Sequence, residues 1–350
     1  MTPQHQTNAA HSDFKTLPVV NVSGLFSSDP QARMVTAKQL GMAAQHAGFM
    51  YISGHGISPT LIDGLLKRTQ AFFAQPLEQK MKNYIGLSTN HSGYVPEGEE
   101  QFAQGSIDHK EAYDIGFDFL QDEGRRPMLG PNQWPPLYGF KADIKRYYDA
   151  VLALSRTLFK GFALALGLPE ETFARNVSTP PSQLRLIHYP YNPDAPVDRP
   201  GIGAHTDYEC FTVLLPTAPG LEVLNGAGAW VDVPPLEGAF VINIGDMLQV
   251  LSNGIYVATS HRVRKVGEER YAFPMFCACD YDTLIEPVSA LCDAGRQPGL
   301  DSLICGEHLY AQTLQTFGYL KQRLQRGELK LPENAKALSS FGHKILAGEQ

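Results

Sequence analysis

A succession of short apolar segments between residues 182 and 279 constrains the fold of this chain more than any other feature. Each segment is a few residues long and is bounded by Gly, Pro or Asn, which is typical of strands that end in turns. The segments are 184–189, 211–215, 221–224, 230–233, 239–244, 255–259, 261–266 and 271–279. Short strands at this density predict an antiparallel barrel or sandwich, such as a jelly roll.

The N-terminal half of the chain differs, because its apolar residues recur mainly at helical spacing. The elements predicted outside the strand-rich region are helices over 31–47, 60–73, 144–168 and 306–326 and strands over 17–22 and 49–52. We therefore expect an α+β fold in which helices buttress a distorted double-stranded β-helix (jelly-roll) core.

One domain is expected over residues 1–350, because no internal repeat or low-complexity linker divides the chain. Its expected parts are a mainly helical N-terminal part (1–181), the jelly-roll core (182–300), and a C-terminal helix and tail (301–350). A composition of 43% hydrophobic and 19% charged residues fits a globular protein of this size.

The charge and the cysteines narrow the choice of partner and compartment. A net charge of −7 disfavours nucleic acid or an anionic membrane as the main partner, because both select for basic surfaces. The five cysteines lack zinc-finger spacing, so reduced thiols and a cytoplasmic location are expected. The polar N-terminus does not fit a secretory signal, and Ser155, Arg156 and Lys160 interrupt the longest apolar stretch, 151–168.

His205 and Asp207 form an H-x-D pair, the sharpest local signal for chemistry in the sequence. Residues i and i+2 of a strand point to the same face, so this imidazole and carboxylate could chelate one divalent metal. His261 lies in a later strand-like segment and would complete a set of two histidines and one carboxylate, the facial triad used for Fe(II). The alternatives are a chance H-x-D in a turn and a core histidine at 261.

Arg270 begins an apolar segment in which residues 270, 272 and 274 would share one face. Because a charge buried without a partner is costly, Arg270 is predicted to bind an anion such as a small dicarboxylate. In the segment 184–189, Arg185 and Tyr189 would also share a face, and the Tyr189 hydroxyl could donate to a carboxylate. The alternatives are an exposed strand-end arginine and a tyrosine that only precedes a terminating proline.

Several segments in the same order resemble one enzyme family, the 2-oxoglutarate/Fe(II) oxygenases related to isopenicillin N synthase. The resemblance covers nearly the whole chain, from Leu17 to about Leu320. The segments that carry it are LPVVNVSGL, AGFMYISGHGIS, SGYVPEGEE, DHKEAYDIG, LRLIHYP, GIGAHTDYECFTVLL, GLEVLNGAGAWVDVPP, INIGDMLQVLSNGIYVATSHRV and RYAFPMF. The number and order of these segments make the resemblance far more specific than any one of them.

The resemblance implies roles for individual residues. It implies that His205, Asp207 and His261 bind Fe(II), and that Arg270, with Tyr189, holds the co-substrate 2-oxoglutarate by its distal carboxylate. The implied reaction uses O₂ to oxidise a small molecule, by hydroxylation above all, with release of succinate and CO₂. Ascorbate is an expected stimulant of turnover, and the sequence carries no prediction of the oligomeric state.

Two positions depart from the family pattern. Ala272 stands where the family's R-x-S motif has its serine, and Ile187 stands where plant members have the asparagine of N-x-Y. Both departures remove polar groups, so weaker binding of 2-oxoglutarate is expected, with more dependence on Tyr189. Gln315 stands where the similar bacterial ethylene-forming enzyme has a substrate-holding arginine, so ethylene formation is not predicted.

Three other functions stay open from the sequence. One is an Fe(II) oxidase of the same fold that does not use 2-oxoglutarate. Another is a zinc hydrolase built on the same triad, which the absence of an H-E-x-x-H helix disfavours. The third is a non-catalytic binding module, which an intact triad disfavours.

Arg185 and Glu100 are the predicted substrate-binding residues. Arg185 would face the cavity beside Tyr189, and its guanidinium would require an anion if buried. With Arg270 assigned to 2-oxoglutarate, Arg185 is predicted to hold a carboxylate of the substrate, and Glu100 to meet an amine or hydroxyl on it. The alternative is a salt bridge between Arg185 and an Asp or Glu of the chain itself.

Overall fold

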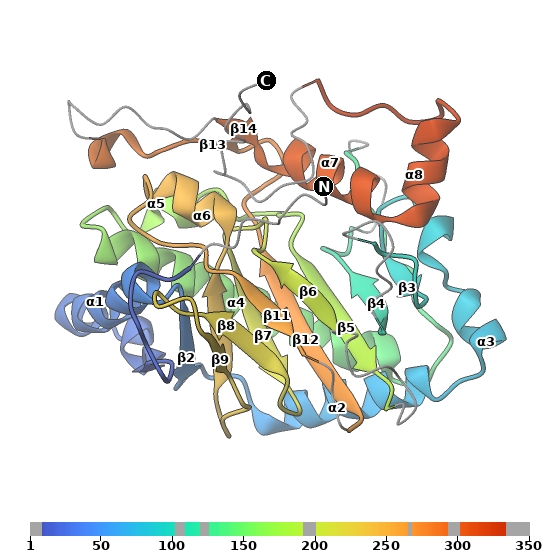
Figure 1. Ribbon diagram of the computed structural model, residues 1–350, viewed down its shortest axis with the longest axis horizontal. Helices are drawn as coiled ribbons and strands as arrows, with labels where there is room; N and C mark the ends of the chain where they lie inside the picture. Colours follow the sequence, from blue (N-terminus) through green and yellow to red (C-terminus); the bar gives the residue numbers. More distant parts are fainter. Residues whose placement is uncertain are drawn as a thin grey trace.

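Two β-sheets face each other in the computed structural model, and helices cover the outer side of the larger one (Figure 1). The structure describes residues 9–101, 109–119, 126–191, 201–264, 268–292 and 302–333. The strand-rich region 182–279 supplies most of both sheets, as the sequence predicts.

The larger sheet has eight strands and is antiparallel except where β1 pairs with β2. Its order is β1 (Val19–Asn21), β2 (Phe49–Ser53), β10 (Phe240–Ile244), β7 (Phe211–Pro216), β12 (Arg270–Cys277), β5 (Gln183–Tyr189), β4 (Glu111–Ile115) and β3 (Gly93–Val95). The smaller sheet is β6 (Ile202–His205), β11 (His261–Val263), β8 (Leu221–Leu224) and β9 (Trp230–Asp232). Two facing antiparallel sheets of this kind confirm the predicted jelly-roll core.

Side-chain alternation divides the larger sheet into an apolar outer face and a mixed inner face. On β12, Tyr271, Phe273 and Met275 pack into the core beneath the helices. The alternate residues of the same strand, Arg270, Ala272 and Pro274, line a cavity between the two sheets. Because a strand repeats every two residues, one segment can supply both the core and the site.

Three long helices cover the outer face, and two of them begin with a side-chain cap. Asp29 accepts a hydrogen bond from Gln31 at the start of α1 (Pro30–His46), and Ser58 accepts one from Leu61 at the start of α2 (Pro59–Phe73). The longest helix, α4 (Phe140–Ala165), packs against both. No helix among the described residues is long and apolar enough to cross a membrane.

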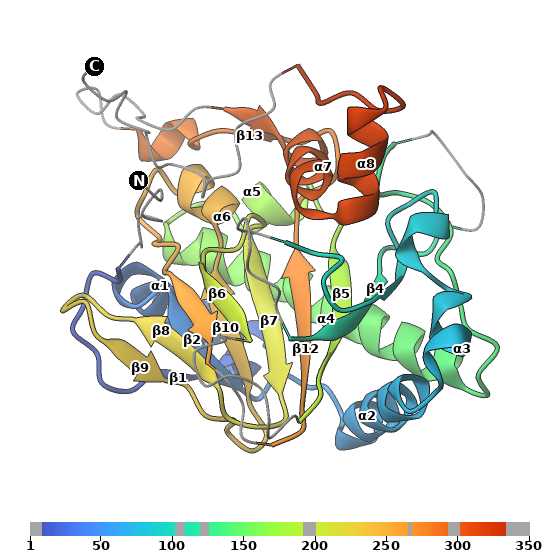
Figure 2. The same cartoon turned by 45° about the vertical axis from the view of Figure 1, so that its right-hand side comes forward.

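The remaining elements are short, and the C-terminal ones lie across one end of the sheets in both views (Figure 1, Figure 2). They are α3 (Leu77–Met81), α5 (Glu171–Ala174), α6 (Asp246–Leu251), β13 (Leu284–Ile285), β14 (Leu303–Ile304), α7 (Cys305–Thr316) and α8 (Gly318–Gln325), with 3-10 turns η1 (Val22–Phe26), η2 (Ile85–Leu87) and η3 (Ser289–Leu291).

Two predicted elements differ from the structure. The strand predicted over 255–259 is wrong, because the amide of Val257 donates to Ala44 and that of Ala258 to the Gln249 side chain, outside any sheet. The predicted helix 306–326 is broken at Phe317, whose ψ of 131° is extended. At that break Phe317 forms an isolated β-bridge with Glu100.

The fold predicts a large cost for removing an aromatic ring between the sheet and α4. Phe211 is fully buried, with ring centroids 4.7 Å from Phe159 and 5.3 Å from Phe162. Phe211→Ala should lower the free energy of unfolding by about 3–5 kcal/mol, the range for emptying a buried aromatic site. Urea unfolding measures this, with Leu87→Ala as the control because Leu87 is 66% exposed. Equal losses in the two variants would contradict the packing described.

Candidate active site

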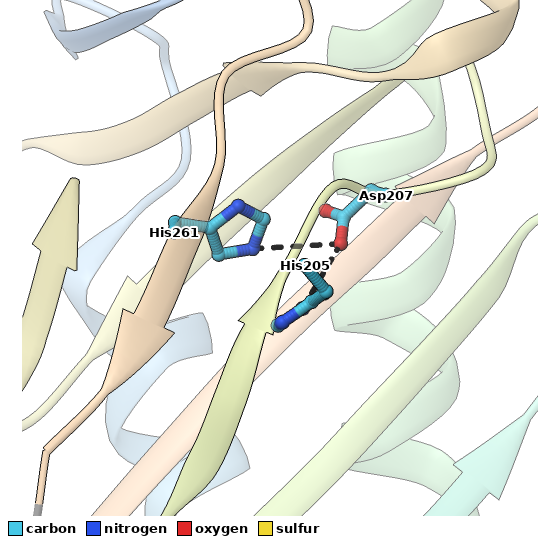
Figure 3. A group of neighbouring side chains, drawn as sticks. All are labelled: His205, Asp207 and His261. Atoms are coloured by element: carbon cyan, nitrogen blue, oxygen red, sulfur yellow. Dashed lines mark ion pairs between the residues drawn. The ribbon is translucent and has the colours of Figure 1, made fainter. Parts of the chain in front are cut away.

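His205, Asp207 and His261 come together where the smaller sheet ends (Figure 3). His205 is the last residue of β6, His261 is the first residue of β11, and the two are register partners. Asp207 lies beyond the end of β6, so the H-x-D pair is not within one strand as expected. One ligand atom from each residue lies within 4.8 Å of the others. The structure therefore brings the three predicted metal ligands together.

The charges of His205 and Asp207 favour the binding of a metal ion. Oδ1 of Asp207 lies 3.6 Å from Nε2 of His205 and 3.5 Å from Nε2 of His261. Burial, with a smaller effect of His261, lowers the pKa of His205 to about 4. Burial would raise the pKa of Asp207, but His261 and His205 hold it well below its usual range. A neutral imidazole at His205 and an ionised carboxylate at Asp207 are the forms that bind metals.

Hydrogen bonds orient all three side chains, and the longest is the 3.4 Å contact between Nδ1 of His261 and the Thr259 carbonyl. Nδ1 of His205 lies 2.8 Å from the Gly203 carbonyl, to which it donates when protonated there, and this places the ring lone pair on Nε2. Oδ2 of Asp207 accepts from Nδ2 of Asn243 at 2.7 Å and from the Thr212 hydroxyl. The other carboxylate oxygen therefore faces the histidines. Two imidazoles and one carboxylate fit Fe(II), with positions left for further ligands.

These residues line a cavity between the two sheets. Alternate residues of β5 and β12 form one wall, and His205, His261 and their neighbours on the smaller sheet form the other. Residues of α7 and the break after it also line the cavity. The larger-sheet residues are Gln183, Arg185, Ile187, Tyr189, Arg270, Ala272, Pro274 and Phe276, and those of the C-terminal helix region are Leu309, Thr313, Thr316 and Phe317. The predicted shared faces of β5 and β12 are confirmed.

Arg270 is a buried cation that lacks a full set of partners. It is 1% exposed, its Nε donates to the Ala218 carbonyl at 3.2 Å, and its Cζ lies 4.7 Å from the centre of the Tyr189 ring. Its Nη1 is buried without a hydrogen-bond partner, and no ion pair of Arg270 is found among the described residues. Ile187 and Ala272 make the surrounding wall apolar. A buried guanidinium with an unused donor suits an anionic ligand.

Arg185 is paired within the chain, so the prediction that it is free to hold a substrate carboxylate is wrong. Its Nε and Nη2 donate to Asp114 at 2.7 and 2.8 Å, and its Nη1 donates to Glu100 at 2.8 and 3.0 Å. Glu100 also pairs with Lys110 at 3.1 Å, so it is not free either. The salt bridge left open as the alternative is the arrangement found, and the carboxylate expected on the substrate loses this support.

Arg185 and Lys110, paired with Glu100 and Asp114, form a buried group of two cations and two carboxylates with little net charge. Burial would raise the pKa of Glu100, but Arg185 and Lys110 lower it to about 2. Burial raises the pKa of Asp114 above its usual value, although Arg185 acts in the opposite direction. Burial would lower the pKa of Arg185, but Asp114 and Glu100 raise it. The two cations and two carboxylates therefore satisfy one another.

Sequence reasoning missed Asp114 and Glu209. Asp114 is the register partner of Arg185 across β4 and β5, and an aspartate in the apolar segment 111–115 was the available signal. Glu209 lines the cavity two residues beyond Asp207, so the pattern H-x-D-x-E was the signal there. Burial, and secondarily Asp207, raise the pKa of Glu209, so a cation beside this carboxyl group would favour its ionised form.

Two family models match the chain. The model for the N-terminal region of a non-haem dioxygenase in morphine synthesis matches residues 17–137. The model for the 2OG-Fe(II) oxygenase superfamily matches residues 180–278, which include the whole candidate metal cluster. The two matches together cover more than half of the sequence.

Curated relatives and a solved structure extend the match over most of the chain. The homoarginine-6-hydroxylase 2-ODD-233 of Oryza sativa subsp. japonica is 34% identical over 327 residues, covering 87% of this chain and 99% of the relative. The 2-oxoglutarate-Fe(II) type oxidoreductase hxnY of Emericella nidulans is 32% identical over 345 residues, covering 94% and 96%. The crystal structure of full-length Neurospora crassa T7H in complex with alpha-KG superposes with a TM-score of 0.76 at 27% identity, covering 92% and 100%.

The ionic group of Arg185 predicts a stability that depends on pH. Glu100→Gln should lower the free energy of unfolding by about 3–5 kcal/mol at pH 7, because it leaves buried cations short of a partner. Since folding lowers the pKa of Glu100 from 4.5 to about 2, its stabilisation is full above the higher value and is lost as the pH falls toward the lower one. Urea unfolding from pH 7 to about pH 3 should show the wild-type and variant stabilities converging.

The control for this measurement is Glu328→Gln, which removes an exposed partner of Arg323 and should cost about 1 kcal/mol or less. A gap between wild type and Glu100→Gln that stays constant with pH would contradict the pairing.

Proposed function

The chain belongs to the 2-oxoglutarate/Fe(II)-dependent oxygenases, and from this premise we propose that His205, Asp207 and His261 hold Fe(II) while Arg270 and Tyr189 hold 2-oxoglutarate. The enzyme oxidises a small molecule with release of succinate and CO₂, and hydroxylation is the outcome proposed for it. One observation carries the residue assignment. The three-residue cluster and the incompletely partnered Arg270 line the same cavity.

The chain's own groups fit Fe(II) and its co-substrate. When bound, Fe(II) supplies O₂ activation coupled to the oxidative decarboxylation of 2-oxoglutarate. His205 and His261 offer nitrogen ligands, and Asp207 offers one negative charge. Thr212 and Asn243 hold that carboxylate in place by hydrogen bonds to its other oxygen. Three protein ligands leave positions for the co-substrate and for O₂.

Arg270 supports the use of 2-oxoglutarate over the oxidase alternative. Its buried Nη1 needs an acceptor, and the distal carboxylate of 2-oxoglutarate supplies one. The Tyr189 ring beneath the guanidinium limits its movement, which lowers the entropy lost on binding. Ala272 contributes no hydroxyl on this wall. An oxidase that does not bind 2-oxoglutarate would leave this donor unsatisfied.

We also propose that the substrate is a free small molecule, and that the chain works as one domain in the cytoplasm. The net charge of −7 supports a partner other than nucleic acid. Strands β1 to β4 pair into the same sheet as the jelly-roll strands, which supports a single domain. Four of the five cysteines are buried and none is in a disulfide, which supports a reducing compartment.

A substrate screen tests the proposed function. Purified protein with Fe(II), 2-oxoglutarate, ascorbate and O₂ would be offered small amino acids, carboxylic acids and nucleobases, including homoarginine and thymine. We expect at least one compound to raise succinate release well above the rate without substrate, with an oxidised product in equal amount. Oxidation of a substrate without succinate would favour the oxidase alternative.

The metal assignment predicts that His261→Ala abolishes tight Fe(II) binding and leaves the fold intact. Even partners of metal ligands contribute about 10–100-fold to metal affinity, so loss of a ligand should weaken binding by at least about 100-fold. Anaerobic Fe(II) titration measures the affinity, and urea unfolding checks the fold. His46→Ala serves as the control, because His46 lies on α1 outside the cavity. Wild-type Fe(II) affinity in His261→Ala would contradict the assignment.

The co-substrate assignment predicts opposite effects of two substitutions. Arg270→Ala should raise the Kd for 2-oxoglutarate by about ten- to a hundredfold, the equivalent of about 1.5–3 kcal/mol for a hydrogen bond to a charged group. Ala272→Ser should lower the Kd, because it adds a hydroxyl donor on the same wall. The control is Arg264→Ala, which removes an exposed arginine paired with Asp232. Unchanged 2-oxoglutarate binding in Arg270→Ala would contradict the clamp.

A further inference from the structure

Glu209 is a cavity-lining carboxylate that the proposed roles leave unused. It lies two residues beyond Asp207 and is half-buried. Its only hydrogen-bonding group is its own backbone, and no side chain among the described residues forms a hydrogen bond or ion pair with it. Glu100, in contrast, lines the same cavity and is paired with two cations. Among the described residues, Glu209 has only a longer-range attraction to Arg185 and no side chain in hydrogen-bond or ion-pair contact.

Glu209 lies at the opposite end of the cavity from Arg270. Phe211 is the register partner of Cys277, so Glu209 lies just past the Cys277 end of β12, whereas Arg270 begins that strand. Seven residue steps along a strand span about 23 Å. The C-terminal helices lie across the sheet end where β12 finishes (Figure 2). With 2-oxoglutarate proposed at Arg270, the Glu209 end is the side left for the substrate.

Charge balance leaves Glu209 as the unmatched group among the described cavity residues. The charges of Fe(II) and Arg270 would balance Asp207 and the two carboxylates of 2-oxoglutarate. Arg185 and Lys110 are balanced by Glu100 and by Asp114 behind them. Glu209 then faces the substrate space without a hydrogen-bonded or ion-paired side chain among the residues that the structure describes. A carboxylate in such a place gains most from a charged donor on the ligand.

We propose that Glu209 binds a cationic nitrogen group, a guanidinium or a primary ammonium, on the prime substrate. This inference rests on the proposed function, because it assumes that the substrate enters the cavity beside the metal. A guanidinium presents two parallel N–H donors to a carboxylate, which adds orientation to charge. The contact would fix the far end of the substrate and present a chosen C–H group to the metal side of the cavity. Glu209 is in this account a specificity-determining residue.

Matched ligand pairs test the proposal, because the two members of a pair differ in whether the end of the side chain carries a positive charge. The pairs are L-homoarginine with L-homocitrulline, L-arginine with L-citrulline, and L-lysine with L-norleucine. Their Kd values would be measured by calorimetry on the full chain with Fe(II) and 2-oxoglutarate in the absence of O₂. Wild type should bind the cationic member of at least one pair about tenfold or more tightly than its neutral partner, the usual minimum for a charged hydrogen bond.

Three variants make the test specific to Glu209. Glu209→Gln keeps the shape and removes the charge, so the cation preference should fall to about one. Glu209→Asp keeps the charge on a shorter arm and should retain part of the preference. Glu222→Gln is the matched control, because Glu222 pairs with Arg262 and does not line the cavity. Its preference should equal that of wild type.

Two results would overturn the proposal. One is a wild-type protein that prefers no cationic member of any pair, and the other is a Glu209→Gln variant that keeps the full preference. The titration of 2-oxoglutarate on the same samples separates this failure from failure of the proposed function. Normal, Arg270-dependent binding of 2-oxoglutarate with no cation preference would remove the role of Glu209 alone. Loss of that binding as well would remove both.

Discussion

The buried Asp207 carboxylate is the interaction on which the site depends, because it joins the two sheets at the point where the chemistry is proposed. One of its oxygens accepts hydrogen bonds from Thr212 on β7 and Asn243 on β10, both in the larger sheet. The other faces His205 and His261 of the smaller sheet. The same residue therefore links the two sheets and supplies the negative charge of the metal cluster. The two sheets enclose a cavity, and the cluster forms part of its wall.

The charges around that cavity fall into two groups with different physical roles. The Arg185 group is satisfied by carboxylates of the chain, and this pairing offsets the desolvation cost of burying its members. Arg270 and Glu209 lack such partners among the described residues, and each lies where a ligand can supply one. In the roles proposed for them, Arg270 accepts an anion and Glu209 a cation within one cavity that also contains the His205–Asp207–His261 cluster. Opposite charges at these two residues would orient 2-oxoglutarate and the substrate separately, so the two ligands need not contact each other.

Much of this arrangement could be predicted from local sequence. The two-residue repeat of strands placed Arg270 and Ala272 on one face, and the H-x-D pair with His261 indicated the cluster. The partners of Arg185 could not be predicted in the same way. Asp114 lies 71 residues earlier in the chain, and the contact depends on the β4–β5 register. The apolar segment 255–259 has strand composition, but its amides are taken by a helix and a side chain.

A crystal structure of the protein grown without O₂, with Fe(II) and 2-oxoglutarate, tests the central claim most directly. The account predicts a metal bonded to Nε2 of His205, an oxygen of Asp207 and Nε2 of His261. It also predicts that the distal carboxylate of 2-oxoglutarate accepts a hydrogen bond from Nη1 of Arg270. A metal bound by other residues, or a 2-oxoglutarate whose distal carboxylate lies away from Arg270, would contradict it.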